Sequence, residues 1–181
     1  MRRALLAFPA LGLALAACGG GDRAAGPPPA APERISLTSS AFDEGGTIPQ
    51  RFSCDGEEVS PPLAWTGVPD DARELTLLVD DPDAPGGTFV HWVLFKVPAD
   101  RERLAAGEVP DGARQGENSR GDAAWAGPCP PKGDDPHHYE FTLYALSSPL
   151  DLPDGAAADE VRDAVGKAAV ARGQLVGCFG R

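Results

Sequence analysis

The sequence predicts a mainly β fold, a two-sheet antiparallel β-sandwich with a C-terminal helix. Three apolar runs have the length of strands and are rich in β-branched and aromatic residues. Turn-forming residues separate these runs, and the chain contains 19 Pro and 22 Gly. Within residues 34–181, one segment has the apolar periodicity of an amphipathic helix. Strands divided by turns rather than by helices favour a sandwich over alternating βαβ units.

The three long strands are expected at residues 75–79 (LTLLV), 89–97 (FVHWVLFKV) and 139–146 (YEFTLYAL). In the second of these, strict alternation places the odd-numbered residues on one face and the even-numbered residues on the other. Both faces are largely apolar, which is typical of a strand covered on both sides. Shorter strands are expected at residues 35–39, 63–65 and 175–179.

The helix is expected over residues 157–171, and Gly173 is expected to end it. Residues 105–132, by contrast, contain few branched apolar residues. A loop of that length is uncommon unless it builds a site, so this segment is expected to carry part of the functional surface. The apolar stripe of the helix consists of Val161, Ala164, Val165 and Ala168.

The N-terminus has the pattern of an export signal. Arg2 and Arg3 precede an apolar stretch too short to span a bilayer, and the LAAC that ends it resembles a bacterial lipobox. We therefore expect residues 1–18 to be a lipoprotein signal peptide, with Cys18 as the lipidated first residue of the mature protein. An ordinary secretory signal with an accidental Cys18 is the alternative. Gly19, where an Asp would indicate inner-membrane retention, favours an outer-membrane lipoprotein that faces the periplasm.

Residues 19–33 are rich in Gly, Pro and Ala and contain no large apolar side chain, so they are expected to form a flexible linker. Residues 34–181 are expected to form one domain. The formal net charge of −11 becomes −13 once Arg2 and Arg3 leave with the signal. Because a nucleic-acid partner requires a basic face, that class of function is disfavoured.

Three cysteines remain in the domain: Cys54, Cys129 and Cys178. An exported protein meets an oxidising compartment, where one disulfide and one leftover thiol are expected from three cysteines. We favour a bond between Cys54 and Cys129, because both lie in turn-rich loops whose geometry can adapt. Three buried thiols are the alternative.

All three histidines lie in two short segments, residues 81–92 and 127–146. Each segment leads from a proline-rich turn into an apolar strand, and we expect the two turns to bring His91 and His137 into one polar pocket. His138 points to the opposite face from His137 and is expected to be solvated. The alternative for His91 is a core histidine with satisfied hydrogen bonds and no functional role.

The two turns contribute carboxylates and rigid backbone. Asp81 and Asp83 of DPDAP are candidates for the pocket, whereas Asp80 is expected to bond nearby turn amides. Amides around the GPCPP turn at residues 127–131 can cradle an anionic oxygen, with the Tyr139 hydroxyl as a further donor. A carboxylate alone repels an anion, so Asp81 is expected to orient a histidine or to bind a ligand amine or hydroxyl.

Taken together, these stretches resemble the phosphatidylethanolamine-binding protein family, specifically its bacterial, Raf kinase inhibitor-like branch. The matching stretches run in order from about residue 39 to residue 181: CDGEEVSPPLAW, DPDAP with the downstream HW, GPCPP, HHYEFTLYAL and GCFGR. The resemblance implies a β-sandwich with a small anion pocket near the surface. In relatives that pocket accepts phosphate, acetate, phosphorylethanolamine or phosphotyrosine-like groups. Members act by binding lipid head groups, or kinases and peptidases that they inhibit.

Carried onto this sequence, the resemblance implies no catalytic residue, no metal and no cofactor. His138 stands where Arg is common, and Trp125 stands where Tyr precedes GPCPP in relatives. Both departures are expected to alter the electrostatics and the rim of the pocket, and neither removes a central ligand-binding residue. The implied ligand-binding residues are Asp81, His91, Cys129, Pro130, His137 and Tyr139, and the supporting residues are Asp83, Trp125, Gly127, Pro128 and Pro131.

We therefore expect a non-enzymatic binding protein with a pocket for a small anion or a phosphorylated head group, tethered to the membrane by the lipid on Cys18. The first alternative is a regulator that docks a partner protein, such as a peptidase or a kinase, and inhibits it. The second is a metal-dependent hydrolase that uses Asp81, Asp83, His91 and His137, since such donors suit zinc. The chain has no H-E-x-x-H, G-x-S-x-G or Walker motif, which disfavours catalysis.

Overall fold

The computed structural model describes residues 26–181, so the predicted signal peptide, its Cys18 and the first part of the predicted linker lie outside the described residues. Strands dominate the described part, and one α-helix precedes the last of them. The elements in chain order are β1 Ser36–Thr38, β2 Gly46–Thr47, the 3-10 turn η1 Gln50–Phe52, β3 Leu63–Thr66, β4 Glu74–Asp81, β5 Phe89–Val97, β6 Arg103–Leu104, β7 Arg114–Gly116, β8 His137–Leu146, α1 Ala158–Ala168 and β9 Ala169–Phe179.

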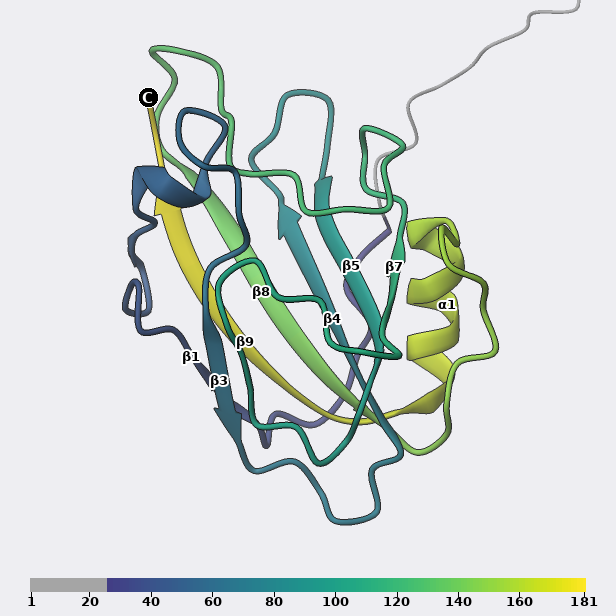
Figure 1. The fold of residues 1–181 in the computed structure, drawn as a ribbon. Coiled ribbons are helices and arrows are strands. Elements are labelled where there is room, and N and C mark those ends of the chain that lie inside the picture. Colours follow the sequence, from purple (N-terminus) through teal and green to yellow (C-terminus); the bar gives the residue numbers. More distant parts are fainter. Residues whose placement is uncertain (1–25) are drawn as a thin grey trace, which may run out of the picture.

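The strands form two sheets (Figure 1). The larger sheet has the order β2-β9-β8-β4-β5-β7, and the smaller has the order β1-β3-β6. The predicted class, mainly β with two sheets and one helix near the C-terminus, is confirmed. One pairing departs from the antiparallel expectation, since β2 runs parallel to β9. The segment predicted as one long loop at residues 105–132 contains β7, which pairs with β5.

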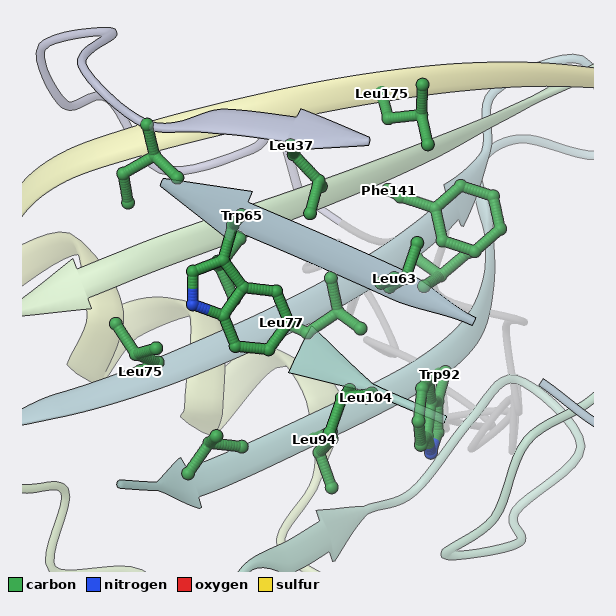
Figure 2. Close-up of a cluster of buried hydrophobic side chains, with 14 of the residues drawn as sticks. Leu37, Leu63, Trp65, Leu75, Leu77, Trp92, Leu94, Leu104, Phe141 and Leu175 are labelled. Atoms are coloured by element: carbon green, nitrogen blue, oxygen red, sulfur yellow. The ribbon is translucent and has the colours of Figure 1, made fainter. Parts of the chain in front are cut away.

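Apolar side chains cover both faces of the large sheet. Leu77 of β4 packs with Trp65 of β3 in a core between the two sheets (Figure 2). Its neighbour Leu78 points the other way and packs with Val161 and Val165 of α1. Burying each of these side chains contributes about 2 kcal/mol of transfer free energy. The large sheet therefore lies between the small sheet and the helix, which explains why its central strands are apolar on both faces.

The strict alternation predicted for residues 89–97 is wrong, because β5 contains a bulge. Consecutive residues of β4 pair with Trp92 and with Val90, so His91 has no partner of its own. A bulge of this kind turns an extra side chain toward one face. The rings of His91 and Trp92 consequently lie on the same side of the sheet, with centroids 6.5 Å and 5.8 Å from that of Trp125.

The helix is shorter than predicted, since α1 ends at Ala168 and β9 follows immediately. Gly173 therefore does not end the helix but lies inside β9. It is required there by a close approach of two backbones, because a Cβ at this position would lie 2.1 Å from the carbonyl oxygen of Ile35. The predicted final strand at residues 175–179 is the second half of the longer β9.

A buried ion pair joins α1 to the sheet. The guanidinium of Arg162 bonds the carboxylate of Asp80, and both side chains are almost fully buried. Burial raises the pKa of Asp80, and the charge of Arg162 opposes that effect. The expectation that Asp80 bonds turn amides is wrong: Asp80 and Asp81 are neighbours on a strand, so they point to opposite faces of the sheet.

The last residues of the predicted linker lie against the domain. The carbonyl of Pro32 accepts the backbone N–H of Arg172 at 2.9 Å, and Glu33 forms a parallel bridge with Arg172. These contacts extend the edge of the large sheet next to β9. Within residues 26–181, no helix combines the length and the hydropathy that crossing a bilayer requires.

Candidate functional site

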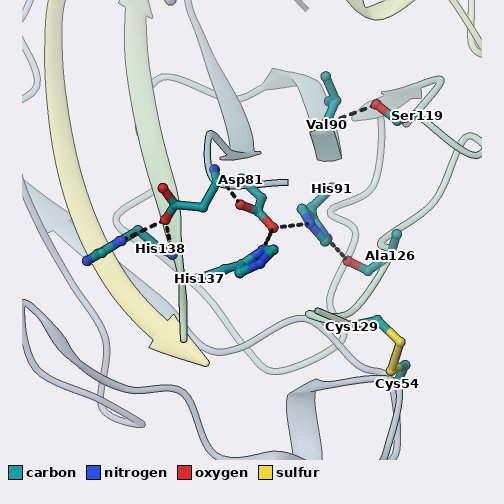
Figure 3. Close-up of polar contacts among 10 residues, drawn as sticks. Cys54, Asp81, Val90, His91, Ser119, Ala126, Cys129, His137 and His138 are labelled. Carbon is teal, nitrogen blue, oxygen red and sulfur yellow. Dashed lines mark hydrogen bonds and ion pairs between the residues drawn. A yellow bond between two sulfur atoms is a disulfide. The ribbon is translucent and has the colours of Figure 1, made fainter. Parts of the chain in front are cut away.

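The polar residues predicted for the pocket gather at one end of the large sheet (Figure 3). Strand β4 ends at Asp81, β5 carries His91 near its start, and β8 begins with His137. Because β4 is antiparallel to both neighbours, its end meets the starts of β5 and β8. Three distant stretches of sequence thus place their polar side chains together, and Tyr139 adds a fourth from β8.

Asp81 is the centre of this cluster. Its Oδ2 accepts a hydrogen bond from Nδ1 of His137 at 2.7 Å and lies 3.9 Å from Nε2 of His91. Its Oδ1 accepts the backbone N–H of Asp83 at 2.9 Å. The bond to Nδ1 fixes the orientation of the His137 ring and leaves Nε2 of that ring available to a ligand. Asp81 is thus bonded to a histidine ring, and its role toward a ligand stays a prediction.

His91 is held by the backbone of the loop before the GPCPP turn. Its Nδ1–H donates to the carbonyl of Ala126 at 2.6 Å, and its own carbonyl accepts the Ala126 N–H at 2.9 Å. Burial lowers the pKa of His91 to about 4, and the Ala126 carbonyl and the Asp81 charge oppose this only in part. In the resulting neutral ring Nε2 is an acceptor. His91 can therefore donate to an anion only after taking up a proton.

Tyr139 brings an unused hydroxyl to the same place. Its side chain is fully buried, and its hydroxyl has no hydrogen-bond partner within residues 26–181. Burial raises the pKa of Tyr139, and the nearby Asp81 carboxylate raises it further although the two groups are not in hydrogen-bonding geometry. The phenol thus stays protonated and available as a donor. Its ring lies edge-on to that of His91, with the centroids 5.1 Å apart.

The GPCPP turn is fastened to the loop around η1. A disulfide joins Cys54 to Cys129, the pairing expected, and Cys178 is the free cysteine of the described chain. The N–H of Cys54 also donates to the Pro128 carbonyl at 3.1 Å. Gly127 permits this contact, because a Cβ there would lie 2.8 Å from the carbonyl oxygen of residue 52. Since its sulfur is in the disulfide, Cys129 is left with its backbone for any ligand.

Trp125 packs behind the turn. Its ring stacks on Phe141 at 6.1 Å and meets Trp92 edge-on at 5.8 Å. Its indole N–H donates to the carbonyl of Phe52 at 3.4 Å. These contacts join the segment before the turn to the core between the sheets.

Asp83 and His138 form a separate pair at the surface. Oδ2 of Asp83 accepts the backbone N–H of His138 at 2.9 Å and its ring Nδ1–H at 2.7 Å. These hydrogen bonds lower the pKa of Asp83. The backbone N–H of Asp83 thus bonds Asp81, whereas its carboxylate bonds His138. Of the four residues proposed for a hydrolase, Asp83 therefore has its carboxylate engaged at the surface, apart from the buried Asp81, His91 and His137. Within the described chain, no three His, Cys, Asp or Glu side chains group in a way that could hold a metal ion.

The buried cluster meets an open hollow at His137. Asp81, His91 and Tyr139 are shielded from solvent, whereas His137 also lines a surface hollow of about 620 Å³. The residues that line the hollow are Asp83, Gly133, Asp134, Asp135, Pro136, His137 and His138.

Two groups at the site were missed by the sequence reasoning. The Ala126 carbonyl fixes His91, and no side-chain pattern could indicate a backbone acceptor. Arg181 bonds the Pro130 carbonyl through Nε at 2.6 Å and Asp55 through Nη1 at 3.1 Å. The only signal for Arg181 was its place at the end of the GCFGR stretch.

Comparisons with known proteins agree on one family. Residues 38–180 match the family model described as phosphatidylethanolamine-binding protein. The Mycobacterium tuberculosis H37Rv protein named "Putative lipoprotein LppC" is 41% identical over 186 residues, covering 94% of this chain and 92% of its own. The structure of Escherichia coli YbcL, described as a member of the mammalian PEBP family, superposes with a TM-score of 0.77 at 30% identity, covering 82% of this chain and 99% of its own. A carboxypeptidase Y inhibitor, solved with its cognate proteinase, has a TM-score of 0.50 at 20% identity over 81% of this chain and 83% of its own, which shows a shared fold.

Proposed function

This chain belongs to the phosphatidylethanolamine-binding protein family, and from that premise we propose that it is a non-enzymatic binding protein for a small anion or a phosphorylated head group. The observation that carries the proposal is the cluster around Asp81. This carboxylate orients His137, while the buried hydroxyl of Tyr139 has no partner within the described residues. An unpaired buried polar group costs about 1–3 kcal/mol, so a ligand oxygen that accepts from Tyr139 would relieve that cost.

The donors suit a phosphoryl or carboxylate oxygen. With Nδ1 of His137 bonded to Asp81, a protonated His137 ring presents Nε2–H to the ligand. Tyr139 would supply a second donor. Hydrogen bonds to a charged acceptor contribute about 1.5–3 kcal/mol each, so two such donors correspond to weak binding, with a Kd from tens of micromolar to several millimolar.

The proposal is tested by adding inorganic phosphate, and separately phosphorylethanolamine, to the purified domain while the histidine NMR signals are followed. The signals of His91 and His137 are expected to shift with saturation, and His137→Ala is expected to abolish the change. His138→Ala is the matched control, because its ring is bonded to Asp83 at the surface and should leave binding intact. Titrations in which neither ligand moves a histidine signal would reject the anion pocket.

We also propose that the protein is exported and anchored through a lipid on Cys18, in an outer membrane facing the periplasm where the cell has one. The similarity to a lipoprotein-named relative covers nearly the whole chain, and the disulfide fits an oxidising compartment. Residues 1–18 would then be removed, and the part of the linker before Pro32 would separate the domain from the bilayer. In detergent phase partitioning the native protein should enter the detergent phase and Cys18→Ser the aqueous phase; equal partitioning of the two would contradict the anchor.

A protein partner is the second candidate, and its support is the fold shared with a carboxypeptidase Y inhibitor. The direct measurement is the activity of carboxypeptidase Y with and without the purified domain. Inhibition that His137→Ala removes would favour the regulator, and full activity at saturating domain would argue against it.

A further inference from the structure

The buried side chains of the site hold little positive charge. Asp81 is a carboxylate, and His91 is neutral near pH 7 because burial lowers its pKa to about 4. A protonated His137 at most balances Asp81. The adjoining hollow adds the carboxylates of Asp134 and Asp135. An anion therefore enters a region whose nearby charge is zero or negative, and Coulomb's law disfavours it unless a further cation acts there.

Arg181 is a cation that the fold fastens beside the site. Strand β9 pairs Phe179 with His137, so the chain end arrives at the same end of the sheet as the start of β8 (Figure 1). There Nε of Arg181 donates to the carbonyl of Pro130 at 2.6 Å. Its Nη1 donates to Asp55 at 3.1 Å and lies 3.4 Å from the sulfur of Cys54. The backbone carbonyl of Arg181 accepts from Gly133 at 3.1 Å.

These contacts leave part of the guanidinium unused. They engage Nε and Nη1, and Nη2 has no hydrogen bond within residues 26–181. The side chain is 23% exposed, so the guanidinium lies in a place partly shielded from water, and charge interactions are stronger in such a place than in bulk water. The charge of Arg181 also reaches the site, because it lowers the pKa of Tyr139 against the larger effect of burial.

The other cations near the site are less well placed. Arg120 lowers the pKa of His91, but its guanidinium pairs with Glu58 at the surface, where both side chains are about 40% exposed. It holds no part of the GPCPP turn. Arg51 pairs with Glu57 on the same loop as Asp55 and is still more exposed.

We propose that Arg181 is an anion-binding residue of the pocket and supplies its fixed positive charge. The inference rests on the proposed function and adds the residue that sets the preferred ligand charge. Arginine keeps its charge at every physiological pH, whereas imidazoles lose theirs between about pH 5 and 8. The Pro130 carbonyl holds the guanidinium in place, and the Asp55 carboxylate offsets part of its charge. Arg181 thus favours dianionic phosphate, such as a phosphomonoester, over a monoanion such as acetate.

The experiment measures inorganic phosphate affinity by calorimetry at about pH 8.5, where an ordinary imidazole is neutral. Arg181→Gln should weaken binding roughly tenfold or more at this pH, the loss expected for a charge-assisted hydrogen bond. Arg181→Lys should restore most of the affinity. Asp55→Asn should strengthen binding about threefold, since it removes a carboxylate next to the cation.

Asp55→Asn separates this role from a structural one. If Arg181 only fastened the turn, Asp55→Asn would weaken phosphate binding as Arg181→Gln does, acetate binding would fall equally, and the inference would be wrong. Arg51→Gln is the matched control, since it removes an equal charge from an exposed pair on the same loop and should change nothing. Wild-type protein that binds no phosphate would overturn the proposed function together with this inference. Wild-type binding that His137→Ala abolishes and Arg181→Gln leaves intact would overturn the inference alone.

Discussion

The buried neutral His91 makes a quantitative prediction about acid stability. Its pKa falls from an ordinary 6.5 to about 4 on folding, chiefly because burial disfavours the charged ring. The unfolded chain therefore holds the His91 proton more tightly than the native state does. By linkage, the contribution of His91 to stability is complete above pH 6.5 and is lost as the pH falls toward 4.

The size of this loss follows from the two pKa values. Each tenfold difference in proton affinity corresponds to 1.36 kcal/mol. Integration between the unfolded and folded pKa values gives a loss of about 2 kcal/mol at pH 5 and about 3 kcal/mol at pH 4. That is a large fraction of the ~5–15 kcal/mol by which a typical domain is stable.

The assay is urea unfolding of the wild-type domain and of His91→Asn at a series of pH values from about 7 to about 4. The asparagine amide can still donate to the Ala126 carbonyl but does not titrate. Buried acids elsewhere, such as Glu74 and Asp80, are present in both proteins and cancel in the difference. The stability of wild type relative to the variant should fall by about 2 kcal/mol between pH 7 and pH 5.

Saturating phosphate provides a second arm of this experiment. An anion beside His91 favours the protonated ring, so the pH-dependent loss should shrink when phosphate is bound. A wild-type-minus-variant difference that stays constant across the pH range would refute the buried neutral state of His91. A difference that appears without phosphate and is unaffected by it would separate His91 from the ligand site.

Three further predictions concern stability. Reducing the disulfide, which spans a sequence separation of 75 residues, should cost about 4 kcal/mol of stability by the chain-entropy estimate. Urea unfolding with and without reductant measures this cost, and unchanged stability would contradict a stabilising disulfide in solution. Gly173→Ala should lower the melting temperature by several degrees, because its Cβ would clash with the carbonyl of Ile35. Gly166→Ala on α1 should instead stabilise the domain by up to about 1 kcal/mol, and equal effects of the two variants would refute the close-approach argument. Arg162→Met should cost about 3–5 kcal/mol of unfolding free energy, because it leaves Asp80 buried without its partner. Adding Asp80→Asn should recover part of that loss, and a double variant no more stable than the single variant would contradict the ion-pair assignment.

Much of the site could be predicted from the sequence, because its members occur in short stretches with strong local constraints. Rigid proline turns placed directly before apolar strands indicated that His91 and His137 would meet. The pairing of neighbouring strands requires the end of β4 to lie beside the starts of β5 and β8, so Asp81 joins them. The sequence also indicated a solvated His138, which the structure places on the surface beside Asp83.

The face on which each side chain lies could not be read from alternation alone. The bulge in β5 turns His91 to the side of Trp92. Such irregularities depend on the partner strand, and a single strand's sequence contains no signal for them. Asp80 and Asp81 illustrate the same point, since the carboxylate of Asp80 bonds Arg162 of the helix on one face of the sheet and that of Asp81 bonds His137 on the other.

The sequence by itself determined the β class, the single helix of the described chain and the residue types of the candidate site, because these follow from periodicity and local turn chemistry. Only the tertiary structure decided that Gly173 belongs to a strand, that the Ala126 carbonyl fixes His91, and that Arg181 lies on the GPCPP turn. Each of these depends on a contact between residues far apart in the chain. Such contacts follow from how the sheets and loops pack together, which no local pattern encodes.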